Sequence, residues 1–325
     1  MVSFRISAPG KVILFGEHAV VYGKTALAGS LSLSSYLTFN QLTLEKHIQI
    51  NMPLVSLSRT ISMDDIRNKL LNSNFPNLSK NGHEDFYQSI QKFVDDLNPV
   101  DNRQRCSLEC FFYALMQVVQ EKGLIIEPFQ ATLGTELPVG AGAGSSASFA
   151  VCLTATFLYW AQIQKKNYSI DLNPSFNSAT LKEVSSYAYN CEKIMHGRPS
   201  GIDNSVCTYG AVIEFRRDES LKFISLCGKQ IKVLLVDTKI GRSTKTLVDK
   251  LAGLKNQYPD IYDKVINAID AVSMKVISIL NKMKNLKDDS IEITESYKEL
   301  AVSFLLNNIS SFKVFFCMFV YSYNY

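Results

Sequence analysis

Glu136-Leu-Pro-Val-Gly-Ala-Gly-Ala-Gly-Ser-Ser-Ala-Ser148 alternates glycine with alanine and then leads into an apolar run over residues 149–161. We expect a strand before it, over residues 123–132, and a helix after it, over residues 146–163. Glycine permits positive φ and the close approach of another group, and successive backbone N–H groups in such a turn form a concave anion site. The free N–H groups of the helix start add to that site. The order strand, glycine loop, helix therefore predicts a bound phosphate at the helix start.

Two better-known glycine loops do not fit this stretch. A Walker loop needs a lysine directly after its last glycine, and none follows Gly144. A dinucleotide-binding loop needs a third glycine where Ser145 follows Gly140 and Gly142. A flexible turn before a core helix is the simpler alternative and stays open here. The Ser145-Ser146 pair weighs against it, because a hydroxyl at a phosphate loop can reach Mg²⁺.

The loop resembles the phosphate loop of the small-molecule kinases that include galactokinase, homoserine kinase, mevalonate kinase and phosphomevalonate kinase. Their pattern is Pro-x-Gly-x-Gly-Leu-Gly-Ser-Ser-Ala, and the chain has Pro138-Val-Gly-Ala-Gly-Ala-Gly-Ser-Ser-Ala147. An alanine replaces the usual leucine, which leaves the backbone cradle possible. The resemblance implies that the nucleotide phosphates bind to this region. The implied nucleotide-binding residues are Lys11, Thr135, Gly140, Ala141, Gly142, Ala143, Gly144, Ser145 and Ser146.

The composition is that of a globular chain with a large core. Of the 325 residues, 46% are hydrophobic and 20% are charged, which excludes a disordered chain and gives room for two subdomains. The net charge of +4, from 34 basic and 30 acidic residues, is too balanced to indicate nucleic-acid binding. Seven scattered cysteines with no signal peptide before them predict free thiols and a cytoplasmic location. We expect Cys106 and Cys110 to be buried on a helix over residues 106–120, and we expect no membrane span, since no apolar segment approaches about 20 residues.

A second distinctive block lies near the N-terminus. Residues 4–7 alternate and are expected to form a strand, and the Pro-Gly pair at Pro9 is expected to break it. A second strand should start at Lys11 and end at the Gly-Glu-His triplet that begins at Gly16. Residues 25–39 mix apolar and hydroxyl side chains and are expected to add strands to the same sheet.

This block resembles the first motif of the mevalonate kinase family. Its most specific part is Gly16-Glu-His-Ala-Val-Val-Tyr-Gly23. The resemblance implies that Lys11 takes part in catalysis as well as in nucleotide binding. It also implies that Glu17 and His18 bind the substrate.

A third block lies between residues 180 and 215. Apolar residues at intervals of three and four predict a helix over residues 180–195, with Glu192 beside the apolar stripe. A loop rich in glycine and proline should follow and carry Asp203, and the chain should return as a strand over residues 206–215. A single acid is by default solvated. Two acids that flank such a loop, in a chain with a predicted phosphate site, favour metal and base roles.

The same block resembles the family motif Glu-Arg-Met-x-His-Gly-x-Pro-Ser-Gly-Val-Asp-Asn. The resemblance implies that Ser146 and Glu192 hold Mg²⁺, a cation that prefers oxygen ligands. It further implies that Asp203 accepts the proton of the attacking hydroxyl, with Lys11 beside it. We expect His196 to cap or pack rather than to act chemically.

The remaining part of the chain is expected to build a mainly helical second domain. After a strand over residues 231–237, the resemblance implies that Arg242 and Thr244 lie over the substrate. Helices are expected near residues 243–256, 260–284 and 291–306.

The resemblance extends from about residue 4 to about residue 306. The family's third motif, a Lys-Leu-Thr-Gly-Ala-Gly-Gly-Gly-Gly-Cys type loop, has no counterpart before the aromatic tail around residues 314–321. We expect the chain to fold its first domain and to bind ATP. We also expect it to turn over mevalonate poorly and to be less stable than a longer relative.

Together these features predict an α+β, two-domain small-molecule kinase fold. Residues 1–226 should form an ATP-binding domain with a mixed sheet and helices, and residues 227–325 an incomplete helical, ferredoxin-like domain. The implied reaction is ATP plus mevalonate giving 5-phosphomevalonate and ADP, with Mg²⁺ as cofactor. We expect a homodimer that binds neither nucleic acid nor membrane.

Two alternatives to this function remain. The chain could be another kinase of the superfamily, which acts on galactose, homoserine or phosphomevalonate. It could also be a catalytically weak or inactive nucleotide-binding relative, because the third motif is missing.

Overall fold

The computed structural model describes residues 2–17, 19–138, 142–165, 171–197, 199–217, 219–226, 231, 244–287 and 290–310, with the backbone alone at 244–250 and 308–310. The chain divides into two compact units. The first unit comprises residues 1–10, 31–137 and 144–209, and the second comprises residues 11–30, 138–143 and 210–325. Strands β1 (Ser3–Phe15) and β2 (Ala26–Gln41) contribute to both units. A domain boundary after residue 226 stays a prediction.

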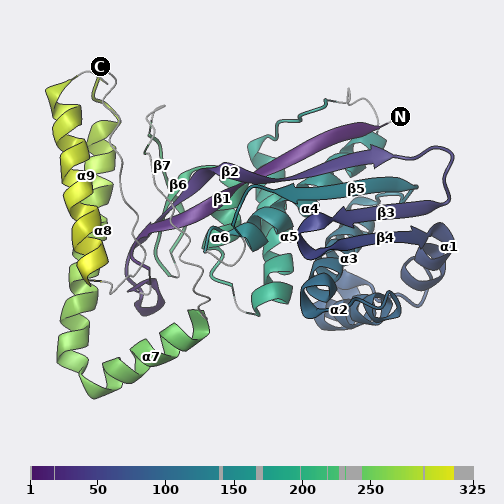
Figure 1. Ribbon diagram of the computed structural model, residues 1–325, viewed down its shortest axis with the longest axis horizontal. Helices are drawn as coiled ribbons and strands as arrows, with labels where there is room; N and C mark the ends of the chain where they lie inside the picture. Colours follow the sequence, from purple (N-terminus) through teal and green to yellow (C-terminus); the bar gives the residue numbers. More distant parts are fainter. Residues whose placement is uncertain are drawn as a thin grey trace. The chain divides into compact units, whose positions relative to one another are not determined.

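The sheet of the first unit is mixed, as predicted. It contains β3 (His47–Met52), β4 (Leu57–Ser62) and β5 (Phe129–Thr135) in the order β4–β3–β5–β2, and β1 pairs with β2 (Figure 1). β2 and β5 are antiparallel, with Ser35 opposite Thr135, whereas β3 and β5 are parallel, with Ile50 opposite Ala131. Burial alternates along β2, where Leu37 is buried and its neighbours are not, so one face of the sheet is covered.

Helices cover that face. They are α1 (Met63–Asp65), the π-turn η3 (Ile66–Leu70), α2 (Leu78–Asp96), α3 (Asn102–Lys122), α4 (Ser145–Gln164), α5 (Ser178–His196) and α6 (Ile202–Tyr209), with a short 3-10 turn η2 (Pro53–Val55) after β3. α4 packs against α3, α5 and α6. The predicted helices at residues 106–120, 146–163 and 180–195 are confirmed.

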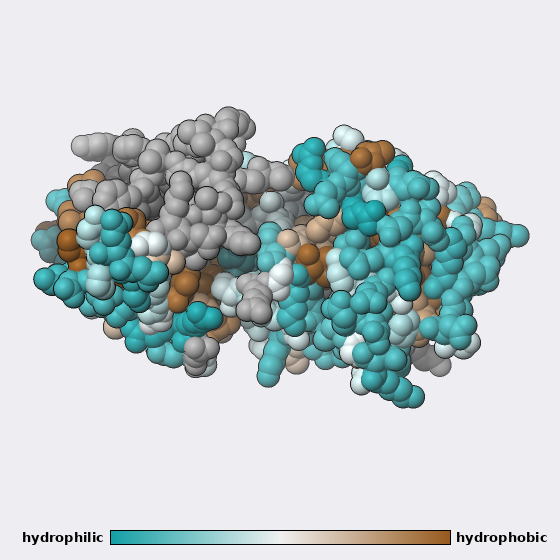
Figure 2. Space-filling model, turned by 90° about the horizontal axis from the view of Figure 1, so that it is seen from below, coloured by the Kyte–Doolittle hydropathy of each residue, from teal (hydrophilic) through white to brown (hydrophobic). Residues whose placement is uncertain are grey.

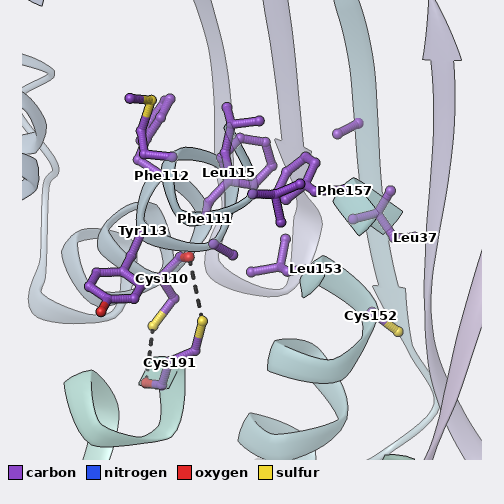
Figure 3. Close-up of a cluster of buried hydrophobic side chains, with 14 of the residues drawn as sticks. Leu37, Cys110, Phe111, Phe112, Tyr113, Leu115, Cys152, Leu153, Phe157 and Cys191 are labelled. Atoms are coloured by element: carbon purple, nitrogen blue, oxygen red, sulfur yellow. Dashed lines mark hydrogen bonds between the residues drawn. The ribbon is translucent and has the colours of Figure 1, made fainter. Parts of the chain in front are cut away.

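Aromatic and aliphatic side chains of α3 and α4 form the core of the first unit (Figure 3). The rings of Phe111 and Phe157 meet edge to face, with centroids 5.3 Å apart. The ring centroids of Trp160 and Phe39 are 4.7 Å apart. In the space-filling view the part that contains α2 is mainly hydrophilic, with few apolar side chains on its surface (Figure 2). The apolar residues of this unit are therefore mostly inside.

α4 is buried on nearly every side, which explains its lack of a polar face. By length and composition alone this 20-residue helix could cross a membrane, contrary to our expectation that no apolar segment is so long. In the fold, however, 78% of its most apolar window is buried inside the protein. That burial is typical of a core helix.

The second unit pairs β6 (Val212–Phe215) with β2 and β7 (Lys222–Ile224) with β6. It also contains the 3-10 turn η1 (Ala19–Tyr22), α7 (Thr244–Gln257), α8 (Pro259–Met283) and α9 (Ile291–Ser310). α8 and α9 pack on each other, and Phe304 contacts Phe15 with ring centroids 4.1 Å apart. The three helices agree with prediction. The strand expected at residues 231–237, of which only Ile231 is described, and the tail at residues 314–321 lie outside the described residues.

Three predicted boundaries are wrong. β1 is continuous through Pro9 and Gly10. Among the described strands β1 pairs with β2 alone, so it lies at an edge of the described part of the sheet, where proline is tolerated. β2 is likewise one long strand and not several. β5 begins only at Phe129 and not at residue 123, because Gly123, with φ +68°, is instead the C-cap of α3, which extends to Lys122.

The largest error concerns the segment after Asp203. The predicted strand over residues 206–215 is a helix, α6, as far as Tyr209, and only residues 212–215 are a strand. The hydroxyl of Ser205 donates to the carbonyl of Gly201 at 2.7 Å, and Val206 is buried where α6 packs on α4 and α5. Tertiary packing thus outweighs the strand preference of the β-branched residues in this segment.

Candidate active site

The start of α4 lies at the end of the glycine loop. Gly144 is the N-cap residue, with φ +71°, and has no side chain that could cap the helix. The N–H group of Ser148 donates to the carbonyl of Gly144 at 2.9 Å, and this hydrogen bond closes the first turn of the helix. Because the first N–H groups of a helix have no intrahelical partner, this end of α4 can receive an anion. The positive φ is the reason for glycine at this position.

Ser148 fastens the start of α4 to the sheet. Its buried hydroxyl donates to the carbonyl of Ala8 on β1 at 2.7 Å and accepts from the N–H group of Ser35 on β2 at 3.3 Å. The thiol of Cys207 on α6 lies 3.9 Å from the carbonyl of Gly144. The start of α4 is therefore fixed by contacts with β1, β2 and α6.

The start of α4 and the end of α5 meet at three polar side chains. His196 is the last residue of α5, and its Nε2 lies 3.0 Å from Oγ of Ser146 and 3.9 Å from Oε1 of Glu192. The side chain of Glu192 is only 3% exposed, whereas that of His196 is 51% exposed. The structure thus brings Ser146 and Glu192 to the same ring nitrogen, and the resemblance implied that these two residues hold one cation. The expectation that His196 caps or packs rather than acts chemically stays a prediction, and nothing in the sequence indicated its contact with Ser146.

These residues fit a magnesium site. One carboxylate and one hydroxyl are hard oxygen donors, the kind that Mg²⁺ takes. Within the described part of the chain no group of three His, Cys, Asp or Glu residues is arranged to hold a metal. Mg²⁺ suits such a sparse set, because it usually keeps several waters and binds substrate phosphates.

A buried thiol pair joins α5 to α3 just before Glu192 (Figure 3). Cys110 Sγ donates to the carbonyl of Cys191 at 3.7 Å, and Cys191 Sγ donates to that of Cys110 at 3.8 Å. Burial, with a smaller contribution from the charge of Glu192, raises the pKa of the Cys191 thiol, so it stays a protonated donor. The five described cysteines are free, as predicted, and the helix that carries Glu192 is fixed to the core at this point.

Asp203 lies in the first turn of α6 and is half-buried. α6 is tied to α5 by the amide of Asn204, which donates to the carbonyl of Ser185 at 2.9 Å and to its hydroxyl at 3.1 Å. The N–H group of Ile202 donates to the hydroxyl of Ser200 at 3.3 Å. A helix tied to α5 therefore carries Asp203, and not the loop rich in glycine and proline that the sequence predicted.

Several predicted residues belong to the second unit. Lys11 is buried, 7% exposed, and its backbone N–H donates to the carbonyl of Ala143 at 3.0 Å. Glu17 is half-buried and follows Gly16, where φ is +77° and a Cβ would lie 2.1 Å from the carbonyl oxygen of Thr25. Only glycine fits there, and it sets the direction of the chain into Glu17. The catalytic and substrate roles of Lys11 and Glu17 stay predictions.

The other predicted residues are less defined. The hydroxyl of Thr135 lies 2.9 Å from that of Ser35 and accepts from the N–H group of Leu137 at 3.1 Å, so it shapes the turn after β5. Gly142 has φ +74°. Thr244 begins α7, but its side chain is not described. His18, Gly140, Ala141 and Arg242 lie outside the described residues.

Comparisons with known proteins identify the family of this chain. The family model described as GHMP kinases N terminal domain matches residues 110–211. The mevalonate kinase of Bos taurus is 32% identical over 288 residues, which cover 86% of this chain and 69% of that protein. That of Arabidopsis thaliana is 32% identical over 311 residues, which cover 91% and 78%. The chain belongs to the mevalonate kinase family. The predicted resemblance and the prediction of a kinase are therefore confirmed.

Solved structures share the fold. The mevalonate kinase of Methanococcus jannaschii has a TM-score of 0.62 at 21% identity, with 95% of this chain and 79% of that chain covered. The mevalonate kinase of L. major, in complex with R-mevalonate, has a TM-score of 0.59 at 19% identity. That match covers 94% of this chain and 74% of the L. major chain. The predicted two-domain kinase fold is confirmed by these similarities.

Proposed function

We propose that the chain transfers the γ-phosphoryl group of ATP to the hydroxyl of mevalonate, with Mg²⁺ as cofactor. The observation that supports this most is the meeting of Ser146 and Glu192 where the uncapped start of α4 faces the end of α5. The mevalonate kinases among its relatives support mevalonate as the substrate. A cytoplasmic homodimer is also proposed, from the composition and the family resemblance.

In the proposed mechanism each residue has a separate task. The N–H groups at the start of α4 hold phosphate oxygens. Ser146 and Glu192 would hold Mg²⁺, which when bound neutralises charge on the phosphates. Asp203 accepts the hydroxyl proton while the hydroxyl oxygen bonds to the γ-phosphorus and the bond from that phosphorus to the bridging oxygen of ADP breaks. The positive charge of Lys11 is proposed to stabilise the charge that develops on the transferring phosphoryl group.

A substrate panel tests the proposal. The purified chain is incubated with MgATP and mevalonate, phosphomevalonate, homoserine or galactose, and ADP release is measured. We expect mevalonate to give the highest kcat/KM. A preference for another acceptor would assign the chain to a different kinase of the superfamily. ATP binding without ADP release from any acceptor would show an inactive nucleotide-binding relative.

Replacement of Glu192 by glutamine tests the metal assignment. Loss of a supporting group near a metal commonly costs about 10–100-fold in affinity, and loss of a ligand charge should cost at least that. We therefore expect the Mg²⁺ concentration at half-maximal rate to rise about tenfold or more, measured at fixed ATP. Glu109→Gln is the matched control, because Glu109 is also a buried glutamate on a helix and its carboxylate accepts a hydrogen bond from Tyr87 at 2.6 Å. This control should leave the Mg²⁺ concentration at half-maximal rate unchanged. A change in the KM for mevalonate alone would instead make Glu192 a substrate ligand.

A further inference from the structure

The side chain of His196 is placed by the end of α5. The next residue, Gly197, has φ +73°, and its N–H group donates to the carbonyl of Lys193 at 2.8 Å, which terminates the helix. His196 is thus the last helical residue, and its ring extends from this end to Oγ of Ser146 at 3.0 Å. The two residues are 50 positions apart in sequence, so the contact depends on the packing of α5 against α4.

When the Ser146 hydroxyl donates to Nε2 of His196, this contact fixes where the hydroxyl points. A serine hydroxyl has one proton to donate and two lone pairs that accept, and it rotates freely unless a partner fixes it. When Nε2 of His196 accepts the proton, both lone pairs of Ser146 remain available to a cation. Oε1 of Glu192, 3.9 Å from the same Nε2, lies close to that point. One ring nitrogen therefore lies next to both oxygens assigned to the cation.

We propose that His196 is a positioning residue, which holds the Ser146 hydroxyl in the orientation that binds Mg²⁺ together with Glu192. This inference rests on the proposed function, in which Ser146 and Glu192 hold the cation. A group that orients a metal ligand through a hydrogen bond typically contributes about 10–100-fold to metal affinity or activity. His196 itself need not touch the metal, the nucleotide or mevalonate.

Calorimetric titration of the full chain with ATP, in Mg²⁺ and separately in EDTA, tests the proposal without any turnover. The measured quantity is the ratio of the two ATP dissociation constants, which gives the gain in affinity due to Mg²⁺. We expect His196→Ala to reduce this gain about tenfold or more and to leave the affinity in EDTA unchanged. His196→Gln should retain most of the gain, because its amide oxygen can accept a hydrogen bond near the position of Nε2.

Two further variants show whether His196 acts through Ser146. In a Ser146→Ala background, His196→Ala should have no additional effect, because the hydroxyl that it positions is gone. His47→Ala is the matched control: His47 also lies beside a glutamate, with Nδ1 3.4 Å from Oε2 of Glu45, but on β3. This control should leave the gain unchanged.

The outcomes separate this inference from the proposed function. If the unmodified chain gains affinity from Mg²⁺ and His196→Ala gains as much, the positioning role is wrong and the proposed function stands. If His196→Ala still lowers the gain in the Ser146→Ala background, His196 acts by another route and the inference is again overturned. If Mg²⁺ does not affect ATP binding by the unmodified chain, both the inference and the proposed metal site are overturned.

Discussion

Asp203→Asn should lower kcat for mevalonate by about 10²–10⁴-fold, the usual contribution of a positioned base, and leave the ATP dissociation constant nearly unchanged. Asparagine has almost the same shape as aspartate but cannot accept the hydroxyl proton. The first turn of α6, tied to α5 through Asn204 and Ser185, should hold either side chain in the same place. The rate is measured by ADP release and the ATP affinity by calorimetry.

Asp260→Asn is the matched control for this variant. Asp260 also lies in the first turn of a helix, α8, but is exposed and has no predicted role, so its replacement should leave kcat unchanged. Near-normal turnover by Asp203→Asn would show that Asp203 is not the base. A parallel loss of ATP affinity would instead assign Asp203 to nucleotide binding.

The helices were predicted best, because burial gives them a clear period. α5 has apolar residues at intervals of three and four, and α4 is an apolar run that starts at a glycine loop. The expected helix starts at residues 146 and 180 lie within two residues of the observed ones, 145 and 178. The prediction for α6 was wrong because its eight residues include β-branched ones, which favour strands. Its packing on α4 and α5 explains why it is a helix.

The sequence pointed to the segments that form the candidate site, but not to the contacts between their side chains. The order of glycines and serines indicated a helix start that binds phosphate, and the spacing of Glu192 and Asp203 around a loop indicated two acids with a shared purpose. The sequence did not show which serine faces which way. Residues two positions apart on a helix point to nearly opposite sides of it. Ser148 is therefore buried against the sheet, whereas Ser146 faces His196. Both contacts join distant parts of the chain and depend on packing.

Phe111→Ala should destabilise the first unit by about 3–5 kcal/mol, the usual cost of removing a buried phenylalanine. The ring is 0% exposed and lies among other aromatic rings, with centroids 5.3 Å from Phe112 and 5.3 Å from Phe157 (Figure 3). Alanine would leave a cavity between α3 and α4 that the rigid neighbours close only in part. At roughly 2–4 °C per kcal/mol for a unit of this size, the melting temperature should fall by about 6–20 °C.

Leu44→Ala is the control, because Leu44 is 94% exposed and its loss should change stability by less than about 0.5 kcal/mol. The core variant also tests how far the site depends on packing beneath it. The first turn of α4 carries Ser146, and Ser148 in the same turn is hydrogen-bonded to β1 and β2. The start of α4 should therefore keep its geometry when the ring of Phe111 is removed. The folded fraction of Phe111→Ala should then bind ATP normally, measured well below its melting temperature. A fall of less than about 2 °C would show that the core closes over the missing ring, and weakened ATP binding at full folding would show that the strain reaches the start of α4.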